Sequence, residues 1–339
     1  MSKKKKIIII ASVAIVLIAG IVAGALILPD YMQGDVPEDK IYGFTEKPED
    51  SVRVMSFNVR YSNVGARSMQ DRIPDVVATV LKGMPDSMGV QEATPEWMEA
   101  LDKELANYYD WVGEGRDGNG TGEYSAVFYL KDKYNLVDSG TFWLSETPDQ
   151  VSQGWDAACN RICTWAILEN KESGDKYIHM NSHFDHVGEK ARSESIKMII
   201  EKSKEYEDMP AVFTADMNVK EGSDNYKQIA QNSIFKDTKY TAENVYDYIT
   251  YHDRFPEKHE GWVIDYCFAN EGFEAITYGV VTESPSKYYV SDHFPIYADL
   301  KLVKKSVIDF DLNIGNIDTG ISIGNDNGLD IDFDFNIQR

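Results

Sequence analysis

Short apolar runs alternate with amphipathic segments along most of this chain, and the two patterns predict strands and helices respectively. Apolar runs rich in β-branched and aromatic residues predict strands at 52–59, 85–92, 125–131, 162–170, 176–184, 210–218, 263–269 and 294–302. Apolar positions three or four residues apart predict helices at 71–84, 95–108 and 188–206. The helix at 95–108 also has a proline near its start and acidic residues in its first turn.

The order of these segments predicts the fold class. Strands and helices are mixed along the chain, and residues 120–185 are mostly strand, which disfavours a strictly alternating βαβ fold. Two β-rich halves of similar size instead predict an α/β (α+β) fold. We expect an α/β sandwich of layered sheets. We place the folded domain at 51–303.

The N-terminal segment has the pattern of a membrane anchor. Residues 1–6 contain a lysine cluster, and residues 7–28 are uncharged and almost wholly apolar. A helix of this length, rising ~1.5 Å per residue, just spans a hydrocarbon core of ~30 Å. The lysines favour a cytoplasmic tail at 1–6, a single transmembrane signal-anchor at 7–28 and a domain outside the cell membrane.

A cleaved signal peptide is the alternative, and the protein would then be secreted. Ala23, Gly24 and Ala25 form a small-residue sequence of the kind that precedes cleavage sites. The apolar run is longer than the ~7–15 residues usual in signal peptides, so we favour the uncleaved anchor. Residues 29–50 are polar and contain prolines, and we interpret them as a linker.

The pattern changes again in the tail, 304–339. Apolar and polar residues alternate at 307–314 and 329–337, with Gly and Asn between them, which predicts strands with one apolar and one acidic face. An added hairpin or a low-complexity tail is the simplest interpretation. Ca²⁺ binding or surface docking by this acidic β-like tail is a hypothesis. Calorimetry would support it if deletion of 306–339 abolished Ca²⁺ binding.

The net charge of the chain limits the kinds of ligand that it can bind. The 339 residues carry a formal net charge of −22 at pH 7, almost all of it between 29 and 305. A domain this acidic repels a long polyanion unless a metal or a local basic patch compensates. Nucleic acid is therefore disfavoured as a ligand, whereas a small phosphorylated substrate is compatible. We expect a monomer.

The three cysteines are Cys159, Cys163 and Cys267. They form no CxxC pattern and are too few for a disulfide scaffold, so we interpret them as buried or idle thiols. On a strand, Cys159 and Cys163 would lie ~13 Å apart at ~3.3 Å per residue and could not bridge each other. A disulfide from either of them to Cys267 stays open.

Short polar strings end many of the predicted strands. They are SFN at 56–58, QE at 91–92, NSHFDH at 181–186, TADMN at 214–218, IDY at 264–266 and SDH at 291–293. Carboxylate and amide oxygens suit a hard divalent cation, and histidines suit phosphate chemistry. One such string is weak evidence, but six in one chain predict a single assembled catalytic site.

The ordered strings resemble those of the endonuclease/exonuclease/phosphatase superfamily, over about residues 51–303. The stretches that look like an uncharacterised bacterial hydrolase branch are GTFWLSETPD (140–149), GWDAA (154–158), RICTW (161–165) and NSHFDHVG (181–188). The resemblance implies a deoxyribonuclease-like, four-layer α/β sandwich of two packed mixed β-sheets flanked by helices. It also implies a metal-dependent hydrolase of phosphoric esters.

The chain departs from that branch at a few positions. Ala215 stands where Gly is usual and Ser182 where Thr is usual, and neither change removes a ligand. Cys159 and Cys163 stand beside Arg161 where the branch usually has other residues. The surroundings of Arg161 are therefore expected to be unusual.

Asn58, Glu92 and Asp292 are the candidate metal ligands. Mg²⁺ prefers octahedral oxygen coordination and commonly takes one or two carboxylates together with water and substrate phosphate. Asn58 and Glu92 meet that need from neighbouring strand ends, and the resemblance adds Asp292. We expect Mg²⁺ as the cofactor, with Mn²⁺ as an alternative.

The resemblance also implies the catalytic roles. Asp216 would orient and deprotonate the attacking water, Asn218 would hold the phosphate, and His183 would donate to a non-bridging phosphate oxygen. Asp265 would hydrogen-bond His293, fixing its tautomer for contact with phosphate or for proton transfer. The plainer alternative is that Asp216 and Asn218 cap a following helix.

Four further residues are candidates for binding the substrate phosphate. A guanidinium matches phosphate oxygens, so Arg161 is the first candidate, ahead of Arg116 and Arg192. On a continued strand, Asp185 would share a face with His183 and thus face the substrate, whereas His186 would point away in a structural role.

These observations predict a membrane-anchored, extracytoplasmic, Mg²⁺-dependent phosphoesterase that hydrolyses a phosphodiester or phosphomonoester by metal-assisted attack of water. A lipid headgroup, a sugar phosphate or a nucleotide would be the small substrate. The alternatives are a secreted or surface nuclease that cleaves DNA or RNA, and a non-catalytic surface-binding protein that retains the fold. The sequence decides neither the substrate nor whether one or two metals bind.

Overall fold

The computed structural model describes residues 36–64, 67–206, 208–232, 234–252 and 261–303, and the backbone of 308–314, 317–323 and 331–336. The chain divides into two compact units, 1–301 and 302–339. The anchor predicted at 7–28 lies outside the described residues. Among the helices that are described, none is long and apolar enough to cross a bilayer.

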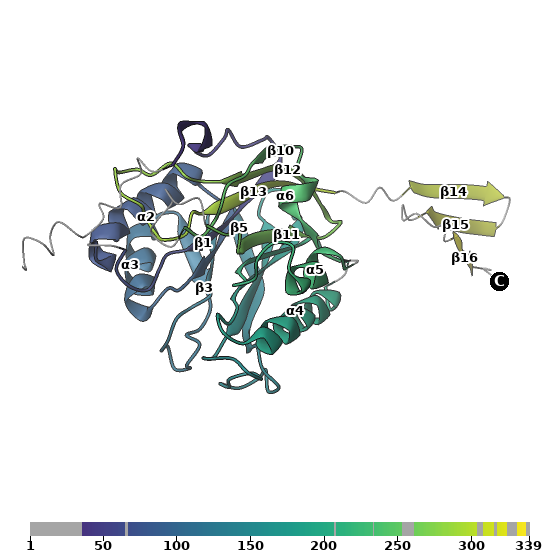
Figure 1. The fold of residues 1–339 in the computed structure, drawn as a ribbon. Coiled ribbons are helices and arrows are strands. Elements are labelled where there is room, and N and C mark those ends of the chain that lie inside the picture. The colour runs from purple at the N-terminus through teal and green to yellow at the C-terminus, as the bar shows by residue number, and fades with distance from the viewer. Residues whose placement is uncertain are drawn as a thin grey trace, which may run out of the picture. The chain divides into compact units, whose positions relative to one another are not determined.

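Two mixed β-sheets build the first unit (Figure 1). The first has the order β10-β12-β13-β1-β2-β4-β3, and its strands are β1 Ser51–Asn58, β2 Ser87–Gln91, β3 Tyr109–Val112, β4 Val127–Leu130, β10 Asn244–Tyr246, β12 Phe273–Val280 and β13 Ile296–Leu302. The second has the order β5-β6-β7-β8-β11-β9, and its strands are β5 Tyr134–Trp143, β6 Ile162–Asn170, β7 Lys176–His183, β8 Ala211–Asp216, β9 Lys236–Asp237 and β11 Asp265–Ala269.

Helices cover the outer faces of these two sheets. Their bounds are α2 Met69–Gly83, α3 Pro95–Leu105, α4 Glu189–Lys204, α5 Asp224–Ala230 and α6 Thr238–Thr241, with a short 3₁₀ helix η2 at Glu38–Lys40. Helices α2 and α3 pack on the first sheet, and α4 and α5 pack on the second (Figure 1). The predicted α/β sandwich of two packed mixed sheets flanked by helices is confirmed.

Alternation along the strands separates an apolar outer face from a polar inner face. In β2, Met88 and Val90 join the core beneath α2 and α3, whereas Ser87 and Gln91 make hydrogen bonds to the second sheet. In β7, Met180 lies in the core beneath α4. Successive side chains of a strand point to opposite faces, so each sheet buries one face against helices and the other against its partner sheet.

Asn181 of β7 is the central polar residue between the sheets. Its amide nitrogen donates to the backbone oxygens of Val90 and Ala126, at 2.9 and 3.0 Å. Its amide oxygen accepts from Gln91 Nε2 at 2.7 Å and from Thr214 Oγ1 at 3.0 Å. These four bonds use the full capacity of a primary amide and tie β7 to strands of both sheets.

Two neighbours extend this polar layer. His179 lies between Ser87 Oγ and Thr214 Oγ1, with 2.8 Å on each side. Burial lowers the pKa of His179 to about 3, so the ring is neutral and bridges two hydroxyl groups. Gly89 lies against the same layer, where a Cβ would collide with the side chains of Asn181 and Thr214.

Part of the predicted linker packs on the domain. The Tyr42 nitrogen donates to Thr282 Oγ1 at 2.7 Å, and the Thr282 nitrogen donates back to the Tyr42 oxygen at 3.0 Å. Arg53 Nη2 donates to the Thr45 oxygen at 2.9 Å, and Lys47 pairs with Asp86. Residues 40–50 therefore belong to the folded unit rather than to a free linker.

The second unit is a three-stranded antiparallel sheet in the order β14-β15-β16. Its strands are β14 Ile308–Ile314, β15 Ile317–Ile323 and β16 Ile331–Asn336. The period-two pattern of the tail therefore predicted strands where strands lie. The Ca²⁺ hypothesis for the tail stays a hypothesis.

We predict that Asn181→Ala destabilises the protein strongly, because it removes one hydrogen bond from each of two backbone carbonyls, one amide and one hydroxyl inside the sandwich. The free energy of unfolding, measured by urea denaturation of the domain, should fall by about 3 kcal/mol. Asn107→Ala, on an exposed turn, is the matched control and should change it by less than about 0.5 kcal/mol. Equal stability of the two variants would contradict the role of Asn181.

Candidate active site

The polar strings come together where the inner faces of both sheets end. His183 of β7, Asp216 of β8 and Asp265 of β11 form one row across three neighbouring strands, because Asp216 pairs in register with each of the other two. In the first sheet, Asn58 of β1 pairs with Gln91 of β2, directly before Glu92. The side chains that the sequence brings to strand ends are therefore neighbours in space.

Asp216 lies at the centre of this group and is 1% exposed. Its Oδ1 accepts from the Asn218 nitrogen at 3.0 Å, and its Oδ2 accepts from Asn58 Nδ2 at 2.8 Å. Burial, followed by the nearby Asp265 carboxylate, raises the pKa of Asp216 well above its ordinary range. Asp216 is thus a more basic carboxylate than one in water.

His293 and Asp265 form the predicted pair. Asp265 Oδ2 lies 2.8 Å from His293 Nδ1, and the opposite ring nitrogen, Nε2, lies 3.8 Å from Asp216 Oδ2. Burial alone would lower the pKa of His293, but the carboxylates of Asp265 and Asp216 outweigh it and raise the pKa. A protonated His293 therefore bridges two carboxylates.

The hydrogen bonds of Asn218 fix the tautomer of His183. Asn218 Nδ2 lies 3.0 Å from the Phe184 oxygen and 3.0 Å from His183 Nε2. Because a carbonyl oxygen only accepts, the amide nitrogen donates to both, which makes Nε2 the acceptor. The ring proton of His183 is then on Nδ1, which is buried and has no hydrogen-bond partner among the described residues. Burial holds the pKa of this ring well below its usual value, so His183 is neutral.

A cavity of about 660 Å³ opens onto these groups. Its charged and titratable lining residues are Arg60, Glu92, Arg116, Glu123, Arg161, His183, His186, Asp216, Lys220 and His293, and Cys159, Asn218, Tyr61, Tyr251, Trp262 and Ile264 complete the wall. Four basic side chains therefore line one cavity of a strongly acidic protein. Inside the cavity, these basic side chains offset the electrostatic repulsion of an anionic ligand that the net charge of −22 predicts.

One atom from each of Glu92, Asp216 and His293 lies within 4.8 Å of the other two, and because His293 is protonated only the two carboxylates offer lone pairs to a cation. Asn58 Nδ2 lies between both carboxylates, 3.1 Å from Glu92 Oε1 and 2.8 Å from Asp216 Oδ2. Buried carboxylates that share one amide donor leave oxygen lone pairs for a cation, and the donor set is rich in hard oxygen. The residues present therefore fit a divalent cation such as Mg²⁺.

Backbone conformation aims several of these side chains. Arg60, Glu92 and Asn218 have φ angles of 58°, 57° and 48°, in the left-handed region that residues other than glycine seldom adopt. Each follows a strand end by one or two residues. Such strained positions cluster at functional sites because surrounding contacts hold them there.

Some predicted binding residues lie elsewhere. Asp185 is buried beside the cavity wall and accepts from the nitrogens of Val187 and Gly188, because β7 ends at His183 and the strand alternation assumed for Asp185 stops there. His186, expected to be structural, lines the cavity instead. Arg192 donates to the Asp185 backbone oxygen at 2.8 Å and does not line the cavity.

Asp292, a predicted metal ligand, pairs with Arg60 and is not in the cluster of Glu92, Asp216 and His293. Arg60 Nε lies 3.4 Å from Asp292 Oδ2, and its Nη1 lies 3.6 Å from Glu92 Oε2. Sequence reasoning did not single out Arg60, Glu123, Lys220 or the aromatic wall. Arg60 and Lys220 each lie two residues beyond a predicted functional asparagine, which is the one signal that pointed to them.

The comparisons with known proteins decide the family. The profile of the endonuclease/exonuclease/phosphatase family matches residues 55–293. The chain belongs to this family. Among curated proteins, none matches the chain. The prediction of an enzyme that hydrolyses phosphoric ester bonds is confirmed at the level of the family.

Solved structures of bacterial family members are similar over the whole domain. A family protein from Bacteroides vulgatus is 39% identical, covering 75% of this chain and 99% of its own, with a TM-score of 0.71. A mannosyl-6-phosphatase from Bacteroides thetaiotaomicron is 34% identical, covering 74% of this chain and 99% of its own, with a TM-score of 0.69. The human Nocturnin catalytic domain, at 17% identity, 79% and 99% coverage and a TM-score of 0.61, shares the fold.

We predict that Asp216→Asn lowers kcat by at least a hundredfold, because an amide cannot accept the proton of an attacking water (~10²–10⁴ for a lost general base). Turnover of p-nitrophenyl phosphate with Mg²⁺ is the measurement. Asp149→Asn, on an exposed loop, is the matched control and should turn over at the rate of the unmodified protein. An Asp216→Asn variant with undiminished kcat would remove Asp216 from the catalytic set.

Proposed function

We propose that this protein is a Mg²⁺-dependent phosphohydrolase of small phosphomonoesters, with a sugar phosphate as its first candidate substrate. Arg161 is the observation that carries the proposal. It lines the cavity, is 5% exposed, and its buried Nη1 has no hydrogen-bond partner in the described part of the chain. A buried guanidinium nitrogen left unpaired is costly, and a phosphate oxygen is the acceptor that best satisfies it.

The charge of the cavity supports a dianionic phosphate. Arg60, Arg116 and Lys220 line the same cavity as Arg161, and a terminal phosphate of a monoester carries more charge than the single charge of a diester. The mannosyl-6-phosphatase, whose own length is matched almost completely, supports a sugar phosphomonoester as the first substrate to test.

The residues divide the chemistry among them. A divalent cation held by Glu92 with Asn58 beside it would polarise the phosphoryl oxygens and neutralise developing charge. Asp216, with both oxygens held by hydrogen bonds, accepts the proton of the attacking water. The Nδ1–H of His183 donates to a non-bridging phosphate oxygen. The cationic His293, positioned by Asp265, stabilises the negative charge that builds up in the transition state.

The same observations give less support to two alternative functions. A nuclease needs a surface that attracts a long polyanion, and the charge of −22 disfavours one outside the cavity. A non-catalytic binding protein would have no use for a buried, basic Asp216 beside a protonated His293, an arrangement typical of proton-transfer sites. Mn²⁺ is the alternative cation, and the expectation of a monomer stays a prediction.

We also propose that the enzyme works outside the cell membrane, tethered by residues 7–28. The proposal rests on the lysine cluster and the apolar length of that segment. A small phosphoester reaches such a site without crossing the membrane.

A panel of phosphoesters tests the function. With Mg²⁺ present, we expect turnover of sugar phosphomonoesters, loss of turnover with EDTA, and recovery with Mg²⁺ or Mn²⁺. Arg161→Lys should raise KM by about tenfold, because one ammonium replaces a fork of donors. Arg67→Lys, whose guanidinium pairs with Asp75 outside the cavity, is the matched control and should not raise KM. Nicking of plasmid DNA without turnover of any small ester would refute the proposal.

Protease treatment of intact cells tests the location. A domain outside the membrane should be digested while a cytoplasmic marker protein stays intact. The membrane fraction should retain the untreated protein, whereas a cleaved signal peptide would release it into the medium. A domain that is protected in intact cells and digested only after lysis would contradict the proposed orientation.

A further inference from the structure

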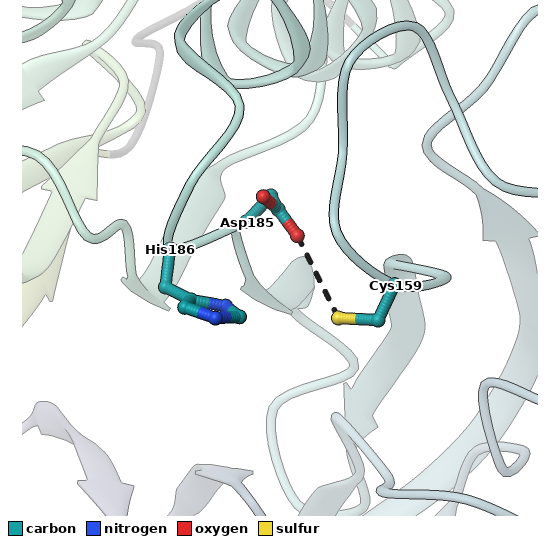
Figure 2. A group of neighbouring side chains, drawn as sticks. All are labelled: Cys159, Asp185 and His186. Atoms are coloured by element: carbon teal, nitrogen blue, oxygen red, sulfur yellow. Dashed lines mark hydrogen bonds between the residues drawn. The ribbon is translucent and has the colours of Figure 1, made fainter.

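Three side chains of unlike chemistry lie close together (Figure 2), and two of them, Cys159 and His186, line the cavity. Cys159 precedes β6, and Asp185 and His186 follow β7. Cys159 Sγ lies 3.6 Å from Asp185 Oδ2, and one ligand atom from each of the three residues lies within 4.8 Å of the other two. None of the three takes part in the chemistry proposed above.

We propose that Cys159, Asp185 and His186 form a binding site for a thiophilic transition-metal ion such as Zn²⁺, separate from the Mg²⁺ site. Among the described residues, the other group of this kind is Glu92, Asp216 and His293, which contains no sulfur. A thiolate, an imidazole and a carboxylate form a donor set that selects Zn²⁺ over Mg²⁺. The sulfur of Cys159 therefore makes this site prefer Zn²⁺, whereas the site without sulfur prefers Mg²⁺.

Asp185 is already oriented as a ligand. Its Oδ1 accepts from the nitrogens of Val187 and Gly188, at 2.9 and 2.7 Å, which fixes the carboxylate. Its Oδ2 points at Cys159 Sγ, as Figure 2 shows. One oxygen thus holds the loop, and the other faces the sulfur. A carboxylate anchored in this way loses little conformational freedom when it binds a metal.

The other two ligands can adjust. Zn²⁺ bonds of about 2.0 to 2.3 Å place the ligands of a tetrahedral site about 3.3 to 3.7 Å apart, so the largest separation here must shrink. His186 is exposed and can turn inward, whereas Cys159 is partly buried at the cavity wall. Water or a substrate oxygen would complete the fourth position.

The same side chains position Arg161. Arg161 Nε lies 3.5 Å from Asp185 Oδ2, and its Nη2 lies 3.2 Å from His186 Nδ1. A metal that takes these two side chains competes with the guanidinium for them and repels it. Metal occupancy would therefore weaken the phosphate contact of Arg161, a consequence that rests on the function proposed above.

Cobalt tests the site directly, since Co²⁺ bound to a thiolate gives a near-ultraviolet charge-transfer band. We expect this band when Co²⁺ is added to the full chain in saturating Mg²⁺, its loss in Cys159→Ser, and its displacement by Zn²⁺. Cys163→Ala removes a fully buried thiol and is the matched control that keeps the band. Absence of the band, or its survival in Cys159→Ser, would overturn the site.

Alkylation of the unmodified protein provides a measurement that needs no variant. Cys159 is the partly exposed cysteine and the other two are buried, so iodoacetamide should label Cys159 first. Zn²⁺ should protect it, as mass spectrometry of the labelled peptide would show. Equal labelling with and without Zn²⁺ would overturn the site even if both variants failed to fold.

Kinetics test the regulatory consequence. In saturating Mg²⁺, Zn²⁺ should raise KM of the unmodified enzyme, and Cys159→Ser should require about tenfold more Zn²⁺ for the same effect. Equal inhibition of both proteins would overturn the regulatory consequence by placing inhibitory Zn²⁺ at Glu92. A protein that shows the cobalt band but turns over no phosphoester would retain the metal site and refute the proposed function.

Discussion

The hydrogen-bonded layer between the two sheets is the constraint on which the rest of the structure depends. Most sandwiches join their sheets with interdigitated apolar side chains, which tolerate small slips. Here Asn181 makes three of its four hydrogen bonds to the other sheet and the fourth to Thr214 of the neighbouring strand, and His179 bridges a hydroxyl from each sheet. A hydrogen bond weakens steeply when its atoms leave the preferred geometry, so these bonds fix the register of one sheet against the other.

This register places the residues of the candidate active site next to one another. The inner face that holds Asn181 within the sandwich holds His183 at its end, because side chains two residues apart share a face. In the first sheet, Asn58 and Gln91 are register partners at the corresponding strand ends. A slip of one residue would send Asp216 into the apolar core beneath α4. The candidate catalytic residues are thus the outermost layer of the polar interface between the two sheets. They are not a separate set of side chains added to an apolar interface.

Much of this arrangement can be predicted from sequence, and the physical reason is the burial of the central strands. Strands β6 and β7, which are buried for most of their length, were predicted to within a residue. Strand β5 escaped prediction because only its two end residues, Tyr134 and Trp143, are buried, and β3 and β10 are very short. Strand β12 was missed as well, although it is largely buried. The joined roles of Asp265 and His293 followed from a resemblance, and the 2.8 Å contact between them agrees.

The loops beyond the strand ends could not be predicted in the same way. Alternation indicated that Asp185 faces the substrate, but the strand stops at His183, and backbone nitrogens turn the carboxylate away. Arg60 and Glu92 adopt left-handed conformations that no propensity predicts for those residue types. Period-two patterns describe strands, and the specificity of an enzyme lies in the segments where that period ends.

The packing of residues 40–50 on the domain has a consequence for how far the enzyme can reach. Contacts from the Lys40 and Tyr42 backbone to Thr282, together with the buried side chain of Val36, hold this part of the chain on the domain. If residues 7–28 anchor the protein as proposed, residues 29–35 separate that anchor from Val36, and a fully extended chain of that length spans at most about 25 Å. An enzyme anchored in that way would work only in the fluid close to the bilayer surface. It would act as a surface-bound scavenger rather than as a catalyst of the bulk medium.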